Sequence, residues 1–88
     1  MKNTPADIHI LIVEDDLASR SLLVSYFENA GYRVSEADNA DHLGARIERD
    51  AVDLVLLDIS LPGKDGLTVT RELRANSSVG IILVTSKG

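Results

Sequence analysis

The stretch DLVLLD, residues 53–58, decides the fold of this chain, because four consecutive apolar residues stand between two aspartates. A short, unbroken apolar run rich in Val and Leu predicts a strand that is buried on both faces, as in a parallel sheet. Two other runs have a similar composition. We therefore expect strands over residues 8–13, 54–59 and 79–84, and a fourth, weaker candidate over residues 33–37.

The segments between these strands are expected to be helical, because their apolar residues recur at helical spacing. The first helix is expected over residues 16–30, with Asp16 as its N-cap and Gly31 as the residue that ends it. Its apolar stripe consists of Leu22, Leu23, Tyr26, Phe27 and Ala30. We interpret the aromatic residues of this stripe as core rather than as a platform for a ligand.

The second and third helices carry similar signals. Asn39 is a candidate cap for the second helix, in which Ala40, Leu43 and Ile47 share one face. The third helix is expected over residues 66–75, with two arginines in its last turns, where cations suit the helix dipole.

Strands that alternate with helices imply parallel pairing through right-handed crossovers. The expected order βαβαβαβ is that of an α/β doubly wound parallel sheet, and 88 residues allow at most one domain. If the strands take the flavodoxin-like order 2-1-3-4, the first and third strands are neighbours and the strand order reverses between them.

Composition and charge exclude several classes of protein. A net charge of −5 without any basic run argues against binding of nucleic acid by this segment itself. The absence of cysteine excludes disulfides and cysteine-based metal sites. Residues 1–7 are polar and form no signal peptide, and no apolar run is long enough to cross a bilayer. We therefore expect a cytoplasmic protein without membrane contact.

Acidic residues follow two of the expected strands. Glu14 and Asp15 come after the first strand, and Asp58 lies at the end of the third. In an open α/β sheet, ligands bind beyond the carboxyl ends of the strands, where the strand order reverses. Three carboxylates that converge there repel one another and require a cation. An all-oxygen ligand set without His or Cys suits Mg²⁺.

Such a site is suited to a phosphoryl group, because Mg²⁺ prefers one or two carboxylates together with phosphate oxygens. A carboxylate such as that of Asp58 can act as a nucleophile and form an aspartyl phosphate. The metal then screens the negative charges of donor and acceptor. The hydroxyl of Thr85, at the end of the fourth strand, is placed to donate a hydrogen bond to a phosphoryl oxygen.

Three segments resemble the motifs of bacterial response regulator receiver domains. They are ILIVEDD (residues 10–16), DLVLLDISLPGKDG (residues 53–66) and IILVT (residues 81–85), and they occur in the family's order and spacing over essentially the whole chain. The segments LPGKDGL (residues 61–67) and VGIILVT (residues 79–85) are similar to the regulators of anaerobic and trimethylamine-oxide respiration. Those regulators are of the OmpR/PhoB type and carry a winged-helix DNA-binding domain.

The resemblance implies a role for each candidate residue. Glu14 and Asp15 would be the acidic metal pair, and Asp58 the phosphoacceptor and a metal ligand. Ser60 would bind the metal through its backbone carbonyl, and Thr85 would be the switch hydroxyl that moves toward the phosphoryl group. The cofactor would be Mg²⁺, the donor a sensor histidine kinase, and the chain a two-component switch rather than an enzyme. Its parent protein would be a transcriptional regulator that binds DNA through a separate C-terminal domain.

The sequence departs from the family at its end. Receiver domains continue with a fourth helix, a fifth strand that bears a Lys, and a fifth helix, so residues 1–88 correspond to a partial receiver domain. Lys87 cannot replace that Lys, because it directly follows the fourth strand. We expect residues 1–7 to be a flexible tail, and we expect the bare sheet edge to favour a homodimer or a domain-swapped dimer.

Plainer interpretations compete with several of these assignments. Asp16 is interpreted as a helix cap rather than as a metal ligand, and His9 and His42 as structural or solvated. A Mg²⁺-dependent phosphatase with an Asp nucleophile would need a second Asp two residues later, where this chain has Ser60. Another alternative is an interaction module or self-associating fragment that is not phosphorylated.

Overall fold

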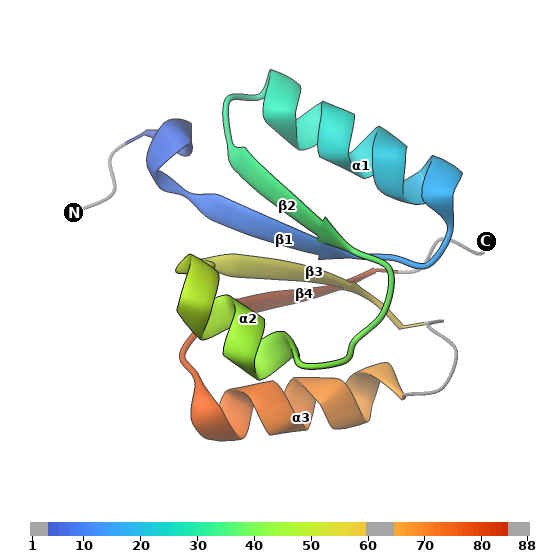
Figure 1. The fold of residues 1–88 in the computed structure, drawn as a ribbon, viewed down its shortest axis with the longest axis vertical. Helices are drawn as coiled ribbons and strands as arrows, with labels where there is room; N and C mark the ends of the chain where they lie inside the picture. Colours follow the sequence, from blue (N-terminus) through green and yellow to red (C-terminus); the bar gives the residue numbers. More distant parts are fainter. Residues whose placement is uncertain (1–3, 60–64, 85–88) are drawn as a thin grey trace.

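A computed structural model describes residues 4–59 and 65–84 and has the expected α/β architecture (Figure 1). The strands are β1 (His9–Val13), β2 (Arg33–Ala37), β3 (Leu54–Asp58) and β4 (Gly80–Val84). The helices are α1 (Leu17–Asn29), α2 (Leu43–Asp50), α3 (Gly66–Asn76) and the 3-10 turn η1 (Pro5–Asp7). This turn falls within the predicted N-terminal tail. Within the described ranges, no helix is long and apolar enough to span a membrane.

The four strands pair in parallel in the order β2-β1-β3-β4, which confirms the predicted sheet. Helix α1 covers one face of this sheet, and α2 and α3 cover the other (Figure 1). Successive strand residues point to opposite faces. Because helices cover both faces, the side chains of the two central strands are covered whichever face they point to. This explains why the sequences of these strands are apolar without alternation.

The core accordingly has two halves. On the α1 side, the buried residues Ile10, Ile12 and Leu56 form one cluster. On the opposite side, the strand residues alternate with these and join the inner faces of α2 and α3. The buried residues of this larger cluster are Leu11, Val13, Ala40, Leu43, Ile47, Val52, Val55, Leu57, Val69, Leu73 and Val79.

Helix α1 begins and ends where the sequence predicts. Asp16 has an extended backbone, and its side chain accepts a hydrogen bond from the Ser19 N–H (2.8 Å), as expected of an N-cap. Gly31 follows the helix with a φ of 99°, a conformation that glycine adopts without steric cost.

The predicted apolar stripe of α1 is wrong at three of its five positions, because Leu22, Tyr26 and Ala30 are exposed. The side chains of Leu22 and Tyr26 are 73% and 69% exposed. The side chains that pack against the sheet are those of Leu23, Val24 and Phe27. The predicted stripe was displaced around the helix, because its exposed residues share one edge, whereas the sheet contacts the opposite edge, beyond which Val24 also packs.

Helix α2 begins at Leu43, later than a cap at Asn39 would place it. The Asn39 side chain instead accepts a hydrogen bond from the Asp41 N–H (2.9 Å), which forms a local turn. His42 precedes the helix with a φ of 59°. The prediction that Asn39 caps the helix is therefore wrong, because its side chain competes for a nearby backbone donor.

His9 is structural, as expected. It is buried at the start of β1, where Nδ1 lies 2.9 Å from the Asp50 carbonyl and Nε2 lies 2.6 Å from the Ser35 hydroxyl. A carbonyl only accepts hydrogen bonds, so Nδ1 is the donor in this contact. The same residue, Asp50, accepts a hydrogen bond from Arg49 with its side chain, and this bond holds the pKa of the Asp50 carboxyl below its ordinary value. His42 is exposed on the surface.

We predict that Ala51→Gly stabilises the fold. Ala51 ends α2 with a φ of 53°, and this left-handed conformation costs an L-residue roughly 1–2 kcal/mol. The greater unfolded-state entropy of glycine offsets part of that gain, so we expect a net increase of about 0.5–1 kcal/mol in the free energy of unfolding.

The matched control is Ala45→Gly, at an exposed position inside α2. This change is expected to cost about 1 kcal/mol. Urea unfolding followed by circular dichroism measures both variants, and equal losses in the two would contradict the assignment of strain to Ala51.

Candidate functional site

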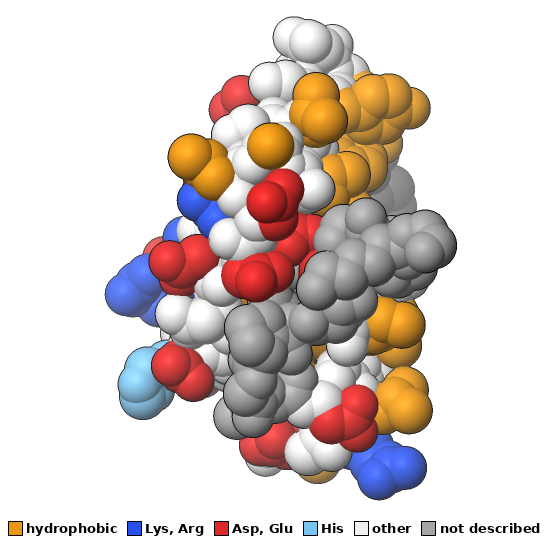
Figure 2. All heavy atoms as spheres, turned by 90° about the vertical axis from the view of Figure 1, so that its right-hand side faces the viewer, with side chains coloured by type: hydrophobic (Ala, Val, Ile, Leu, Met, Phe, Trp, Pro, Cys, Tyr) orange, Lys and Arg blue, Asp and Glu red, His pale blue; other side chains and the backbone are white. Residues whose placement is uncertain are grey.

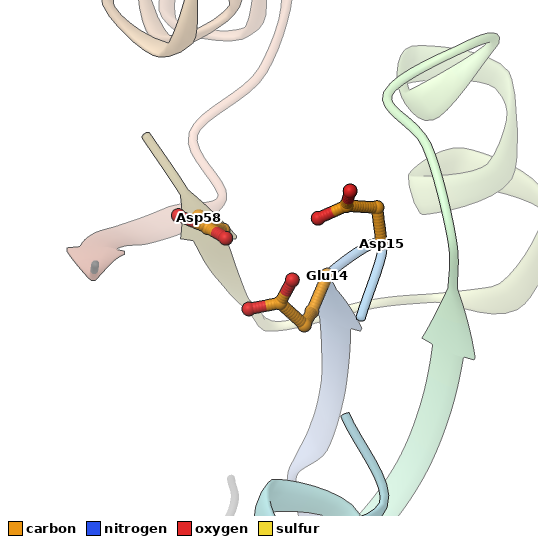
Figure 3. A group of neighbouring side chains, drawn as sticks. All are labelled: Glu14, Asp15 and Asp58. Atoms are coloured by element: carbon orange, nitrogen blue, oxygen red, sulfur yellow. The ribbon is translucent and has the colours of Figure 1, made fainter. Parts of the chain in front are cut away.

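Three carboxylates lie at the carboxyl ends of the two central strands. Glu14 and Asp15 directly follow β1, and Asp58 is the last residue of β3. Each offers an oxygen, and these oxygens lie within 4.8 Å of one another. Figure 3 shows the side chains directed toward a common space. The structure therefore brings together the three residues that the sequence predicted to converge.

The three carboxylates differ in burial. The exposed fractions of Glu14 and Asp58 are 1% and 0%, whereas Asp15 is exposed to solvent. The strand ends that carry the buried pair face the viewer in Figure 2, where acidic side chains gather at the middle of the surface. Asp15 therefore forms the solvent side of the site, and the other two form its floor.

Main-chain pairing holds the two strand ends in place. The Glu14 N–H donates to the Ala37 carbonyl at the end of β2 (3.0 Å), and the Glu14 side chain accepts a hydrogen bond from the Asp16 N–H (2.9 Å). On the other side, Asp58 is paired with Val84 in the register of β3 and β4. The main-chain positions of both buried residues are thus set by the sheet, and the turn at Asp16 holds the Glu14 carboxylate.

This donor set fits a hard divalent cation. Carboxylate oxygens are the ligands that Mg²⁺ and Ca²⁺ prefer. Among the described residues, the cluster consists of carboxylates and contains neither His nor Cys. Two negative charges about 4 Å apart repel by about 1 kcal/mol in water and about 4 kcal/mol at the effective dielectric of a protein surface. A divalent cation would relieve that repulsion.

The remaining predicted site residues have separate outcomes. Asp16 caps α1 through its side chain, as described above, while its own N–H binds Glu14. Ser60, Thr85 and Lys87 lie outside the described residues, so the roles expected for Ser60 and Thr85 stay predictions.

Arg20 was not predicted to belong to the site, yet it adjoins it. Its Nη1 donates to the Glu14 carbonyl (2.9 Å), and its Nε donates to the Glu36 carboxylate (2.8 Å). One sequence signal was available. A cation in the first turns of a helix is disfavoured by the helix dipole, so Arg20 at that position calls for a specific partner.

Known proteins resemble this chain over most of its length. The sequence profile of the response regulator receiver domain matches residues 10–88. The transcriptional regulatory protein AruR of Pseudomonas aeruginosa is 52% identical over 83 residues, and the TorCAD operon transcriptional regulatory protein TorR of Escherichia coli is 48% identical over 79 residues. These matches cover 89% and 90% of the chain but 34% of each relative, so the chain spans about a third of their length.

Solved structures show the same fold. The receiver domain of TorR, the response regulator of the trimethylamine-oxide respiratory system, matches with a TM-score of 0.81 at 48% identity and covers 91% of this chain and 67% of that one. The predicted likeness to regulators of this respiration is thereby confirmed.

A second structural relative carries ligands. The response regulator TrrA of Thermotoga maritima, in complex with Mg²⁺ and beryllofluoride, matches with a TM-score of 0.83 at 34% identity. The match covers 92% of this chain and 71% of that one. TrrA is also known in complex with the histidine kinase ThkA, a structure that matches with a TM-score of 0.82.

We predict that Asp58→Asn stabilises the metal-free chain. The amide keeps the shape of the side chain but removes one of two buried charges that repel each other. The expected increase in the free energy of unfolding is on the order of 1–3 kcal/mol, measured by urea unfolding in the presence of a chelator.

Asp41→Asn is the control, because Asp41 is exposed and lies outside the cluster. Its effect is expected to stay within about 0.5 kcal/mol. If Asp58→Asn instead lowers stability, repulsion among the three carboxylates is not a cost of the metal-free fold.

Proposed function

This chain belongs to the response regulator receiver domain family, and on that basis we propose that it is a phosphorylation switch whose acceptor is Asp58. The observation that carries the proposal is the convergence of Glu14, Asp15 and Asp58 at one end of the sheet. Asp58 is one of the two buried members and lies on β3 at the switch point between β1 and β3, where ligands of open α/β sheets bind.

The proposed metal is Mg²⁺, held by the three carboxylates and by the backbone carbonyl of Ser60. When bound, the cation offsets the negative charge of the carboxylates and of an incoming phosphoryl group. Glu14 and Asp15, which follow β1, and Asp58, at the end of β3, would hold it. The Mg²⁺ in the related TrrA complex supports this choice of ion.

The proposed donor is a phosphohistidine of a sensor histidine kinase. A carboxylate oxygen of Asp58 attacks the phosphorus, the phosphorus–nitrogen bond breaks, and its electron pair returns to the imidazole of the kinase. The product is an acyl phosphate on Asp58. The complex of TrrA with ThkA supports a partner of this kind.

The proposed readout is the hydroxyl of Thr85. Asp58 pairs with Val84 across β3 and β4, and Thr85 follows Val84 directly in the sequence. A hydrogen bond from this hydroxyl to a phosphoryl oxygen would couple the two added negative charges to a change in conformation.

The wider role is proposed from the relatives. AruR and TorR are named as transcriptional regulatory proteins. We propose that the parent of this chain is a cytoplasmic regulator of the same kind, in which a separate C-terminal domain binds DNA. The segment itself would act as a switch rather than as an enzyme on an external substrate.

The phosphorylation test uses the chain, Mg²⁺ and a small acyl phosphate as donor, with intact mass as the readout. One phosphoryl group is expected on the parent chain and none on Asp58→Asn. The variant Asp41→Asn should be phosphorylated like the parent, and a chelator should abolish the adduct in both. Equal phosphorylation of Asp58→Asn and the parent would remove Asp58 as the acceptor.

A second candidate role, self-association, is favoured by a separate observation. In the sheet of the described residues, β4 is an edge strand, and Ile82 and Leu83 on it are 48% and 37% exposed. An exposed apolar edge invites pairing with another strand.

We predict that the chain forms a concentration-dependent dimer and that Ile82→Lys weakens it, because a charge on an edge strand opposes pairing. Sedimentation velocity over a range of concentrations measures both proteins. A parent chain that stays monomeric and folded throughout would exclude this role.

A further inference from the structure

Arg20 is a largely buried cation beside the carboxylate cluster. It belongs to the first turns of α1, and its side chain is 15% exposed. Two hydrogen bonds hold the guanidinium, one to the Glu36 carboxylate on β2 and one to the Glu14 carbonyl at the end of β1. Arg20 therefore joins a helix to two neighbouring strands at the edge of the site.

The position of Arg20 is costly for a cation. The N-terminus of a helix carries partial positive charge, and the first turn of α1 reads LASR, without an acidic residue. Ordering an Arg side chain also costs rotamer entropy, up to about 2 kcal/mol. Bonds to a carboxylate and a main-chain oxygen offset these costs, since charge-assisted hydrogen bonds are about twice as strong as neutral ones.

The bond to Glu14 has a geometric consequence for the site. The Glu14 N–H is bound to the Ala37 carbonyl (3.0 Å), and the Glu14 carbonyl is bound to Arg20 (2.9 Å). Both polar groups of the Glu14 main chain are therefore fixed. The Glu14 carbonyl belongs to the peptide that links Glu14 to Asp15, so this peptide cannot rotate without breaking the bond to Arg20, and the orientation of the two side chains relative to each other depends on it.

We propose that Arg20 is a positioning residue for the metal site, acting through the Glu14 carbonyl on the carboxylates of Glu14 and Asp15. This inference rests on the proposed function, because it presumes that these carboxylates hold Mg²⁺. Glu36 on β2 holds Arg20 in place by accepting a hydrogen bond from its Nε. The bond to Glu14 uses a main-chain oxygen, so through it Arg20 orients the ligands without occupying a carboxylate oxygen.

The test compares Mg²⁺ affinity in Arg20→Met and the parent chain by isothermal titration calorimetry. Met keeps an apolar stem of similar reach and removes every donor. Residues that orient metal ligands typically contribute 10–100-fold to affinity, so we expect the Kd for Mg²⁺ to rise about tenfold. Arg20→Lys retains the charge but lacks the two separate donor nitrogens that bind Glu36 and the Glu14 carbonyl. Its Kd for Mg²⁺ should therefore lie between those of the parent chain and Arg20→Met.

A second readout needs no metal. The carbonyl of Glu14 belongs to the peptide whose N–H is that of Asp15, so loss of the hydrogen bond from Arg20 should shift the ¹⁵N resonance of Asp15 in the metal-free chain. The matched control is Arg46→Met on α2. The side chain of Arg46 is 31% exposed and pairs with Asp50 at the end of its own helix, so neither readout should change.

Each outcome decides the matter. If Arg20→Met lowers stability but leaves the Kd and the Asp15 resonance unchanged, Arg20 is merely structural and the proposal is overturned. If Arg20→Met does not fold, Glu36→Gln takes its place, with an expected rise in Kd of a few-fold, and an unchanged Kd overturns the proposal. If the parent chain binds no Mg²⁺, the metal site of the proposed function fails together with this inference.

Discussion

The parallel pairing of β1 with β3 is the contact on which the rest of the structure depends. Its register joins Ile10 to Leu54 and continues to Val13 and Leu57. One step beyond that register come Glu14 on one strand and Asp58 on the other. The hydrophobic contacts that bury the two strands therefore also set the separation of the two buried carboxylates. Each buried Ile or Leu of this pair contributes about 1.5–3 kcal/mol, so the register resists displacement by the charges at its end.

Those charges oppose the fold that brings them together. Burying Glu14 and Asp58 beside each other is unfavourable in the absence of a cation, because each carboxylate loses hydration and gains a like-charged neighbour. A divalent ion turns the same arrangement into a favourable one. The preformed binding site for an ion and a phosphoryl group thus lowers the stability of the metal-free chain, as functional sites commonly do.

Hydrogen bonds from neighbouring residues hold both the main chain and the side chains of the cluster. The Asp16 N–H binds the Glu14 carboxylate, while the Asp16 carboxylate caps α1. Arg20, one turn further along α1, binds the Glu14 carbonyl. One short turn therefore links the start of α1 to the end of β1. Because the helix and the ligands share these contacts, a change at the site can reach α1.

The sequence by itself determined the elements, their order and the residues of the cluster. Unbroken apolar runs require strands covered on both faces, and helices between parallel strands bring the carboxyl ends to one edge. Acidic residues placed after β1 and β3 then converge if these strands are neighbours, which is the order that the structure has. The inferences about the elements hold because they follow from periodicity, which is a local property of the chain.

Only the tertiary structure decided which apolar residues the core accepts and which polar groups hold the site. Leu22 and Tyr26 fit a helical stripe, but the sheet contacts the neighbouring side of α1 and leaves them exposed. Asn39 has the chemistry of a helix cap, but its own turn takes the hydrogen bond. The contacts of Arg20 cross from α1 to two strands. Such choices depend on how separate elements approach one another, and no local pattern of residues records that.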